Sequence, residues 1–364
     1  SFGRVPPLCS RSGRKARGRR VRVVTVRAIE WDPATDRLRL LDQTKLPGES
    51  VHLDIKSVDA LVDAIAILAV RGAPALGVAG AMGVVTALDE GAERGWSADE
   101  VLEAVDRIAA ARPTAVNLAW GVDQVRGLID QGRDAVLEAA RRVAVEDEAA
   151  NRELSRLGAD WLLARVDRPR LRVLTHCNAG ALATAGWGTA LGLVRELAHR
   201  DRLELVYADE TRPLLQGARL TAYELAQEGI PHVVQVDGAA ASTILRGLVD
   251  CAIVGSDRIA ANGDVANKIG TVAVALACRE AGVPFVVAAP WSTVDLATAS
   301  GEDIEIEERS GVEVTSCAGV RVAPAGSEGF NPAFDVTPAR MVSAIVTERG
   351  VVEPATGQRM IEEG

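Results

Sequence analysis

After residue 166, short apolar segments alternate with longer helical segments, and this alternation limits the folds open to the chain. Segments rich in Gly, Ala and Leu lie between the apolar segments. The expected strands cover residues 172–175, 204–208, 232–236, 252–254 and 285–289. Strands that alternate with helices are typical of a doubly wound sheet, in which helices cover both faces of parallel strands. We therefore predict a Rossmann-like catalytic domain over residues 166–364.

The first half of the chain has a different pattern. The β-like residues between 21 and 55 predict a hairpin, whose turn is at residues 32–36, and a third strand at 51–55. From residue 57 to residue 164, apolar residues recur at helical spacing, and Ser57 is a candidate helix cap. For residues 21–165 we predict a small antiparallel sheet followed by a helical bundle. The whole chain of 364 residues is thus expected to be an α/β protein with two domains.

The composition restricts the classes of function. The formal net charge of −9 argues against broad binding to nucleic acid, although a local basic pocket for an anionic metabolite stays open. No apolar run reaches the roughly 18 uncharged residues that a membrane-spanning helix needs. We therefore expect a cytoplasmic protein that has neither nucleic acid nor a membrane among its partners.

The cysteine, histidine and glycine patterns argue against several cofactors. The five cysteines form no Cys-x-x-Cys pair, so we expect reduced thiols rather than disulfides or a zinc site. Asp, Glu and His are not arranged as a metal cluster, and no Gly-x-Gly-x-x-Gly follows a strand. We predict a protein with no metal and no other cofactor.

Residues 1–20 form a basic segment without an acidic residue. The composition is similar to that of a transit peptide, but Pro6, Pro7, Gly13 and Gly18 interrupt any amphipathic helix. We expect a disordered tail or an extended start, and its role stays open.

The segment from Val254 to Thr271 carries the strongest functional signal. Asp257 comes just past an apolar strand, a polar loop follows, and a helix is expected to begin near Val265. Ligands of open α/β sheets bind outside the carboxyl ends of the strands. There Asp257 could donate a proton, Asn267 could orient a hydroxyl and Lys268 could hold a phosphate. Alternatively, Asp257 is a turn residue; the nearby Asp264 is expected to cap the helix.

Cys177 also follows an expected strand. Small residues and then a helix come after it, and backbone N–H groups in such a place make a thiol more acidic and so a competent acid or base. The alternative is a buried cysteine used as a small apolar residue. His176 is expected to point to the opposite face of the strand.

Three further stretches are candidates for binding a phosphate or a hydroxyl. Arg71, Gly72 and Ala73 place a guanidinium and bare backbone N–H groups at a helix start. Gln216 lies near another helix start, and Arg112 precedes a third. The alternatives are a close helix contact at Gly72, a capped helix with an Arg212–Glu210 ion pair, and a plain surface position for Arg112.

Together these stretches closely resemble the methylthioribose-1-phosphate isomerase family. That family is related to the regulatory subunits of eukaryotic initiation factor 2B and to archaeal ribose-1,5-bisphosphate isomerase. The resemblance runs from about residue 29 to residue 352. The motifs shared by the whole superfamily are Arg71-Gly72-Ala73-Pro74, Cys177-Asn178 and residues 255–271. The motifs more typical of the methylthioribose enzymes are Leu41-Asp42-Gln43-Thr44-Lys45-Leu46-Pro47, residues 112–118, residues 210–221 and residues 331–338.

The resemblance implies an aldose–ketose isomerase that acts on a small sugar phosphate, without a cofactor and usually as a homodimer. It makes Asp257 the proton donor and Cys177 its partner at the reacting centre. The residues that it assigns to substrate binding are Arg71, Gly72, Ala73, Arg112, Gln216, Asn267 and Lys268. One departure is Ser256, where the family more often has Ala, and the basic tail is also outside the pattern.

Several alternatives stay open. The resemblance does not decide between proton and hydride transfer, nor between methylthioribose 1-phosphate and ribose 1,5-bisphosphate or 5-deoxyribose 1-phosphate. A non-catalytic subunit similar to those of initiation factor 2B is a different class of function. Such a subunit is not expected to keep both Cys177 and Asp257.

Overall fold

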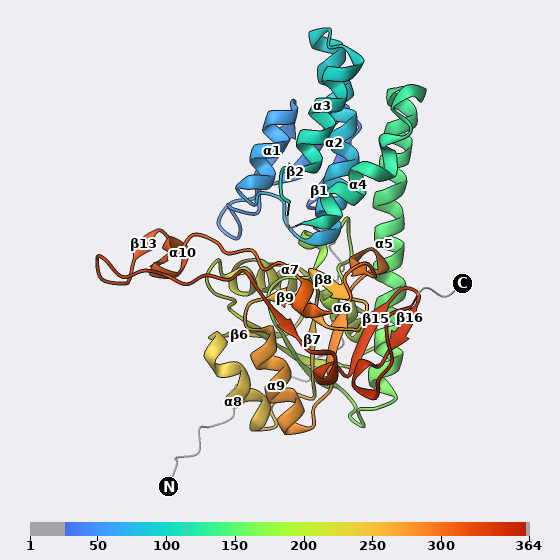
Figure 1. Ribbon diagram of the computed structural model, residues 1–364. Helices are drawn as coiled ribbons and strands as arrows, with labels where there is room; N and C mark the ends of the chain where they lie inside the picture. The colour runs from blue at the N-terminus through green and yellow to red at the C-terminus, as the bar shows by residue number, and fades with distance from the viewer. Residues whose placement is uncertain (1–25, 114, 362–364) are drawn as a thin grey trace.

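The computed structural model describes residues 26–113 and 115–361, so the basic tail expected at residues 1–20 lies outside them. Figure 1 shows a helical part, built from the first half of the chain, above a sheet-containing part built from the second half. The long helix α5 (Arg133–Leu163) lies alongside both parts. The fold is α/β, as the sequence predicts. The domain boundary near residue 166 stays a prediction, because α5 packs against α2 as well as α6 and β15.

A small antiparallel sheet comes first. It consists, in this order, of β1 (Ile29–Asp32), β2 (Arg37–Leu41) and β3 (His52–Ile55). In β2, the buried Leu38 and Leu40 alternate with less buried arginines, so one face of the sheet packs on the helices. The predicted hairpin and third strand are confirmed.

The helical part packs around an apolar central helix. Its helices are α1 (Val58–Ala66), α2 (Ala73–Arg94), α3 (Ala98–Ala109), α4 (Val116–Arg126) and the long α5. Ser57 caps α1 by accepting a hydrogen bond from the amide of Ala60, as expected. A Cβ on Gly121 of α4 would lie 1.9 Å from the carbonyl oxygen of Gly77 of α2, so small residues allow these helices to touch. Helix α2 is long and apolar enough to cross a bilayer, but 83% of its apolar window is buried inside the protein, as in a core helix.

The main sheet has seven strands in the order β16-β15-β10-β7-β4-β5-β6. Six strands are parallel, and only β16 is antiparallel to its neighbour. The strands are β4 (Leu171–Thr175), β5 (Leu203–Asp209), β6 (His232–Gln235), β7 (Cys251–Val254), β10 (Phe285–Ala288), β15 (Ala344–Thr347) and β16 (Gly350–Val352). The helices of this part are α6 (Ala190–His199), α7 (Ala222–Glu228), α8 (Ala240–Leu245) and α9 (Thr271–Ala281).

Successive residues of the central strands face two different layers of helices. Val173 of β4 belongs to an apolar cluster with residues of α5 and α6, whereas Leu174 belongs to a cluster with residues of α8 and α9. Both faces of the sheet are therefore covered, which explains why its strands read as continuous apolar runs. The doubly wound sheet predicted for this half is confirmed.

A second, four-stranded sheet corrects one prediction. Its order is β11 (Val294–Asp295), β8 (Arg258–Ala260), β9 (Val265–Lys268) and β14 (Phe334–Thr337). The helix expected near Val265 is wrong, because residues 265–268 are a buried strand and α9 begins only at Thr271. Asp264 consequently caps no helix, and its carboxylate accepts hydrogen bonds from the amides of Gly301 and Ala339.

Short elements complete the structure. An arm extends from the sheet-containing part and consists of α10 (Val312–Thr315), β12 (Ser316–Cys317) and β13 (Val320–Arg321) (Figure 1). The single turns are η1 (Ile129–Gln131), η2 (Ala181–Ala183), the π-helical η3 (Gly217–Thr221), η4 (Asp237–Ala239), η5 (Trp291–Thr293), η6 (Gly301–Asp303), η7 (Ala339–Met341) and η8 (Pro354–Thr356). In the segment of residues 301–309, Gly301 and Ile304 are buried.

Candidate active site

A narrow pocket of about 70 Å³ opens where β4, β7 and β10 end, opposite the N-terminus of α2. Parallel strands end at the same edge of a sheet, so residues far apart in the sequence meet there. The pocket brings together all nine residues singled out from the sequence. They are Arg71, Gly72, Ala73, Arg112, Cys177, Gln216, Asp257, Asn267 and Lys268.

Cys177 has an unusual backbone conformation. Its φ is +66°, in the left-handed region that non-glycine residues rarely adopt, and such strain occurs most often at functional sites. Two threonines hold it: the amide of Cys177 donates to Oγ1 of Thr211 at 2.8 Å, and Oγ1 of Thr221 donates to its carbonyl at 2.7 Å. The thiol is partly exposed and lines the pocket.

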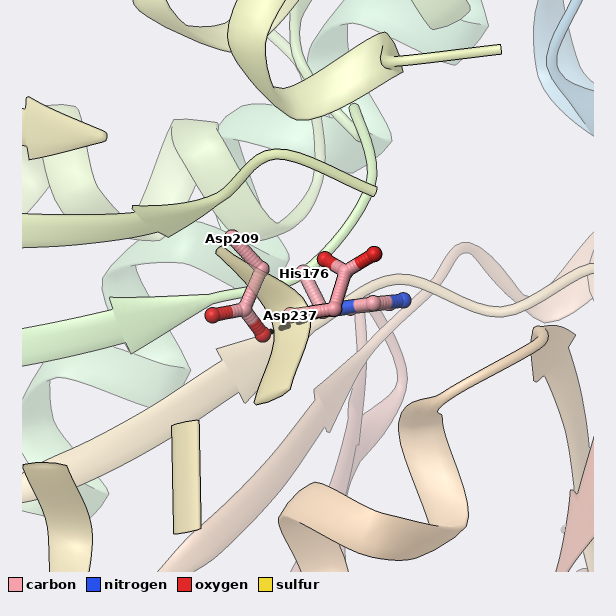
Figure 2. A group of neighbouring side chains, drawn as sticks. All are labelled: His176, Asp209 and Asp237. Atoms are coloured by element: carbon pink, nitrogen blue, oxygen red, sulfur yellow. Dashed lines mark hydrogen bonds and ion pairs between the residues drawn. The ribbon is translucent and has the colours of Figure 1, made fainter. Parts of the chain in front are cut away.

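His176, directly before Cys177, belongs to a buried cluster with Asp209 and Asp237 (Figure 2). Ligand atoms of these three residues lie within 4.8 Å of one another, as a metal site would need. However, Asp237 accepts hydrogen bonds from the amides of Thr211 and Arg212, both at 2.7 Å, and Nδ1 of His176 lies 2.9 Å from Asp209. The polar groups thus satisfy one another, and we do not assign a metal to the cluster.

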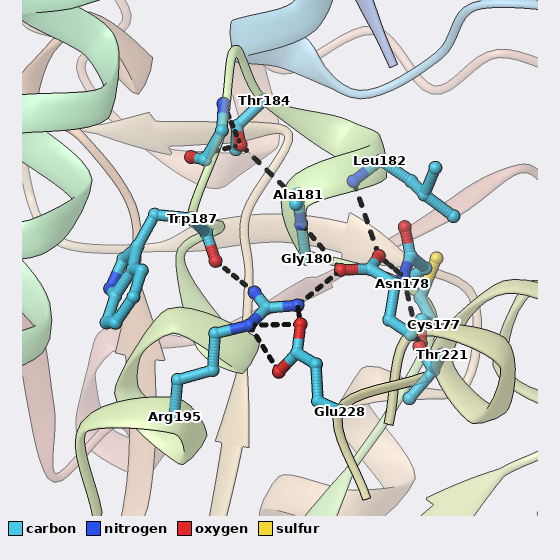
Figure 3. A network of polar contacts seen from close by, with 12 residues as sticks. Cys177, Asn178, Gly180, Ala181, Leu182, Thr184, Trp187, Arg195, Thr221 and Glu228 are labelled. Atoms are coloured by element: carbon cyan, nitrogen blue, oxygen red, sulfur yellow. Dashed lines mark hydrogen bonds and ion pairs between the residues drawn. The ribbon is translucent and has the colours of Figure 1, made fainter. Parts of the chain in front are cut away.

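Below the Cys177 loop lies a buried network of charges (Figure 3). The guanidinium of Arg195, only 1% exposed, donates to the carboxylates of Glu224 and Glu228 and to the carbonyl of Trp187. Glu224 in turn accepts hydrogen bonds from the amides of Ala181 and Leu182 and from the side chain of Asn178. The network therefore fixes the loop that follows Cys177.

Asn178 connects this network to the pocket. Arg71 donates to its backbone carbonyl, and Nη2 of Arg71 lies 3.1 Å from its side-chain oxygen. Nε of Arg71 is buried without a partner among the described residues. Asn178 thus holds the guanidinium of Arg71 in place through its two Nη atoms, beside the pocket.

The N-terminus of α2 faces the same pocket. Gly72 has φ +99°, and a Cβ at this position would lie 2.5 Å from the carbonyl oxygen of Ala183, so only glycine fits. No side chain of residues 26–113 or 115–361 caps the helix. The unpaired N–H groups of a helix start, together with the helix dipole, favour an anion.

Asp257 and Lys268 have shifted ionisation equilibria. Burial raises the pKa of Asp257, although the charges of Lys268, Arg112 and Arg71 act against the shift. Burial lowers the pKa of Lys268, whose ammonium lies 4.7 Å from the centre of the Phe334 ring. The protonated form of Asp257 is therefore favoured more than in water, which suits a general acid.

Arg112 lies at the pocket, not at the plain surface. Its guanidinium is 2.9 Å from a carboxylate oxygen of Glu307, and Arg309 lies 3.1 Å from the other oxygen. Arg309 also pairs with Glu313 at 2.6 Å. Arg309 and Phe334 line the pocket but were missed from the sequence. Phe334 lies within the family motif at residues 331–338, which was the one signal for this part of the site, and no motif covered Arg309.

Gln216 lies where β5 is followed by η3, and its side chain is 95% buried. Its Oε1 has no hydrogen-bond partner among the described residues. Buried polar atoms normally have partners, so an orphaned one beside a pocket indicates a place for a ligand or a water. Arg212 makes no ion pair with Glu210 in the described part of the chain, and it donates instead to backbone carbonyls of the arm, including Val314.

Comparisons with known proteins agree with this geometry. The model of the initiation factor 2 subunit family matches residues 69–354. The methylthioribose-1-phosphate isomerase of Anaeromyxobacter dehalogenans is 54% identical over 327 residues, which cover 90% of this chain and 94% of that protein. A probable bifunctional methylthioribose-1-phosphate isomerase/methylthioribulose-1-phosphate dehydratase of Nocardia farcinica is also 54% identical, but the chain spans only 59% of its length. The crystal structure of 5-methylthioribose 1-phosphate isomerase from Pyrococcus horikoshii is 39% identical, covers 90% of this chain and 92% of its own, and superposes with a TM-score of 0.80.

Proposed function

Because the chain belongs to the initiation factor 2 subunit family and has relatives named as isomerases, we propose that it converts 5-methylthioribose 1-phosphate to 5-methylthioribulose 1-phosphate. It would then be an aldose–ketose isomerase of methionine salvage. One observation carries the proposal: a thiol, an acid with a raised pKa and several cationic groups line one pocket. A non-catalytic subunit would have no need for this combination.

The substrate carries phosphate on its anomeric carbon, so its ring does not open spontaneously to an aldehyde. Protonated Asp257 would donate its proton to the ring oxygen while the bond from that oxygen to C1 breaks. The left-handed backbone of Cys177 and its partial exposure at the pocket support a role for its sulfur in the next step on the opened sugar.

The second step moves hydrogen from C2 to C1. In one route the Cys177 thiolate takes the C2 proton and an enol phosphate forms between C1 and C2. The thiol then returns a proton to C1, while the C2 hydroxyl loses its proton to the Asp257 carboxylate. In the other route C2 passes a hydride to the electron-poor C1, and the C2 hydroxyl loses its proton to a base. Both routes leave a ketone at C2 and balance in hydrogen, and both need a pocket that excludes water.

We propose that the phosphate binds between Arg71, Lys268 and the free N–H groups of Gly72 and Ala73. Arg112 and Gln216 lie on the same pocket and would contact the phosphate or a sugar hydroxyl, and Asn267 would orient a hydroxyl. The orphaned Oε1 of Gln216 would gain a donor when the substrate binds.

The charges around the pocket favour a substrate with one phosphate. Arg112 and Arg309 both pair with Glu307, and Arg309 pairs with Glu313 as well. These arginines therefore offer less net charge to a second phosphate. Ribose 1,5-bisphosphate is accordingly the less favoured alternative, and 5-deoxyribose 1-phosphate differs only in an uncharged substituent.

The proposal is tested by turnover of the purified chain on methylthioribose 1-phosphate, ribose 1,5-bisphosphate and 5-deoxyribose 1-phosphate. We expect the highest kcat/KM on the methylthio compound. Loss of most activity in Cys177→Ser, with an unchanged melting temperature, would support the role of the thiol. No turnover of any of the three sugars by the native chain would refute the isomerase function.

We further propose a homodimer in the cytoplasm. The edge strand β6 exposes Val234 and Val236, and Leu245 of α8 and Leu276 of α9 are exposed in the same part of the fold. Such an apolar surface at a sheet edge supports a contact between subunits. Light scattering of the purified chain should give a mass near 77 kDa, about twice 38.3 kDa. A mass near that of one chain would refute the dimer.

A further inference from the structure

His176 joins two segments of the active site, although the mechanism gives it no role. The ring is 2% exposed and follows directly on β4, one residue before Cys177. Its Nε2 lies 2.8 Å from the carbonyl oxygen of Ile269. A carbonyl oxygen only accepts hydrogen bonds, so Nε2 must carry a proton and donate it to this bond. One imidazole thus ties the Cys177 loop to the segment that follows Lys268.

The other ring nitrogen faces a carboxylate. Nδ1 lies 2.9 Å from Oδ2 of Asp209, whose second oxygen accepts a hydrogen bond from Gln235 (Figure 2). Burial lowers the pKa of His176, but the hydrogen bond and charge of Asp209, the Ile269 carbonyl and the charge of Asp237 together raise it. Asp335 adds a third carboxylate charge near the ring. These partners favour an imidazolium with protons on both nitrogens.

The peptide bond between Ile269 and Gly270 is held at both ends. Its carbonyl accepts from His176, and its N–H donates to Oδ2 of Asp335 at 2.8 Å. The imidazole also packs directly on Gly270, where a Cβ would lie 2.9 Å from its Cε1. A peptide bound on opposite sides by β4 and β14 has little freedom to move.

The Ile269–Gly270 peptide directly follows Asn267 and Lys268, the two residues of β9 that are candidates for binding the substrate. Oγ1 of Thr271 donates to the carbonyl of Lys268 at 2.6 Å, and Nδ2 of Asn267 donates to Oγ1 of Thr271 at 2.9 Å. Lys268 and Cys177 lie close enough for their charges to interact. Pairing of β9 with β14 holds the backbone of Lys268, and the contact between His176 and Ile269 adds a direct link from the end of β9 to the Cys177 loop.

We propose that His176 is a positioning residue, which sets Asn267 and Lys268 against Cys177 by donating a hydrogen bond from Nε2 to the Ile269 carbonyl. The role rests on the proposed function, because it assumes that Lys268 binds the substrate phosphate. His176 also lines the pocket, but the proposed role is indirect, through the Ile269 carbonyl.

Two amide variants separate the two contacts of the ring. In His176→Gln the side-chain N–H₂ reaches the place of Nε2 and still donates to Ile269. In His176→Asn it reaches only the place of Nδ1 and donates to Asp209. We expect KM for methylthioribose 1-phosphate to rise about tenfold or more in the Asn variant, with a smaller fall in kcat, and the Gln variant to stay within a few-fold of the native protein.

A readout without substrate keeps this test separate from the isomerase function. Iodoacetamide alkylation of Cys177, followed by mass spectrometry, should slow several-fold in His176→Asn but not in His176→Gln, because a displaced Lys268 no longer stabilises the thiolate. Binding of inorganic phosphate should likewise weaken in His176→Asn and stay nearly unchanged in His176→Gln. If the native chain turned over none of the sugars, the isomerase proposal would fail while these two measurements still tested His176.

The charge of the ring is tested by nitrogen NMR. The chain has four histidines, so the His176→Asn variant assigns the signal of His176. We expect both ring nitrogens to be protonated at pH 7.5, and only one in Asp209→Asn, which keeps the hydrogen-bond geometry but removes the charge. An Nε2 without a proton in the native protein, or equal losses of activity, alkylation rate and melting temperature in the Gln and Asn variants, would overturn the proposal.

Discussion

Two buried polar clusters lie on either side of the Cys177 loop, and they differ in how well their groups are paired. In the cluster around Arg195, the guanidinium has carboxylates and a carbonyl as partners, and Glu224 accepts several further hydrogen bonds. In the pocket, Nε of Arg71 and Oε1 of Gln216 are buried and find no partner in the part of the chain that the structure describes. Burial also disfavours the charges of both Asp257 and Lys268.

This difference in pairing indicates that the Arg195 cluster is a structural scaffold and that the pocket is a binding site. Charges that satisfy one another stabilise a unique arrangement, and removing one partner leaves the other buried alone. Groups left incomplete in the folded chain lower its stability, and a ligand that completes them regains that free energy on binding. Substitutions in the pocket should therefore change catalysis, and substitutions in the Arg195 cluster should change folding.

The sharpest test of this separation is Asp257→Asn. We expect turnover to fall by about 10² to 10⁴-fold, because an amide cannot donate the proton to the ring oxygen. The melting temperature should not fall, since the change removes a carboxyl group whose charge is disfavoured by burial. Steady-state kinetics and thermal unfolding measure the two effects.

Asp264→Asn is the matched control in the neighbouring β8–β9 turn. Its hydrogen bonds to backbone amides lower the pKa of Asp264 despite partial burial, so its charge stabilises the fold. We expect this variant to lose stability and to keep its kcat. If Asp257→Asn lost stability and kept its turnover, while Asp264→Asn kept its stability and lost turnover, the distinction between binding site and scaffold would be contradicted.

Arg195→Met tests the scaffold. It leaves Glu224 and Glu228 buried without their cation, so we expect the free energy of unfolding to fall by about 3–5 kcal/mol. The control is Arg200→Met, which breaks partly exposed ion pairs with Asp160 and Glu196 and should cost under about 1 kcal/mol. Denaturant unfolding gives both values. Equal costs would mean that the buried network adds nothing special.

A phosphate ligand should stabilise the native protein through the pocket. At a concentration 100 times its Kd, a ligand that binds only the folded state adds about 2.7 kcal/mol. We expect inorganic phosphate to raise the melting temperature, and Lys268→Met to abolish most of the rise. A rise of the same size in the Lys268→Met variant would place the anion elsewhere.

The carboxyl group of Asp147 is less completely paired than the Arg195 cluster and more completely paired than the groups of the pocket. It accepts hydrogen bonds from two uncharged donors, the amide of Ala185 and the side chain of Asn151. Burial raises its pKa from 3.8 to about 7, so the folded chain holds a proton that the unfolded chain releases. Stability contributed by this group is thus present below pH 3.8 and is lost as the pH rises to 7. We expect Asp147→Asn to raise the stability at pH 8 by about 1–2 kcal/mol and to change little at pH 4, as thermal melts across this range would show.

Five strands of the main sheet, β4, β5, β6, β7 and β10, could be predicted because each is a short apolar segment in the sequence, whereas β15 and β16 were missed. Cys177 and Asp257 could be placed at strand ends for the same reason. The strand β9 could not be predicted, because four residues with mixed periodicity become a strand only through pairing with β14, some seventy residues later. Arg309 and Phe334 were missed because they lie just before and just after the arm, and only tertiary contacts bring these two segments to the pocket.

Asp264 shows the same limit for a single side chain. Its position before an expected helix made it a capping residue, whereas its partners, the amides of Gly301 and Ala339, are distant in the sequence. Local patterns therefore indicate what a residue can do, and tertiary contacts decide which of these roles it takes.

Helix α5 has 31 residues and is about 46 Å long, and it lies against both halves of the molecule. The pocket is divided in the same way, since Arg71 and Arg112 come from one half and Cys177, Asp257 and Lys268 from the other. A bound sugar phosphate would therefore be a noncovalent crosslink between the halves, parallel to the helix. Damage to α5 far from the pocket should accordingly appear in assays as weaker substrate affinity, not as slower chemistry.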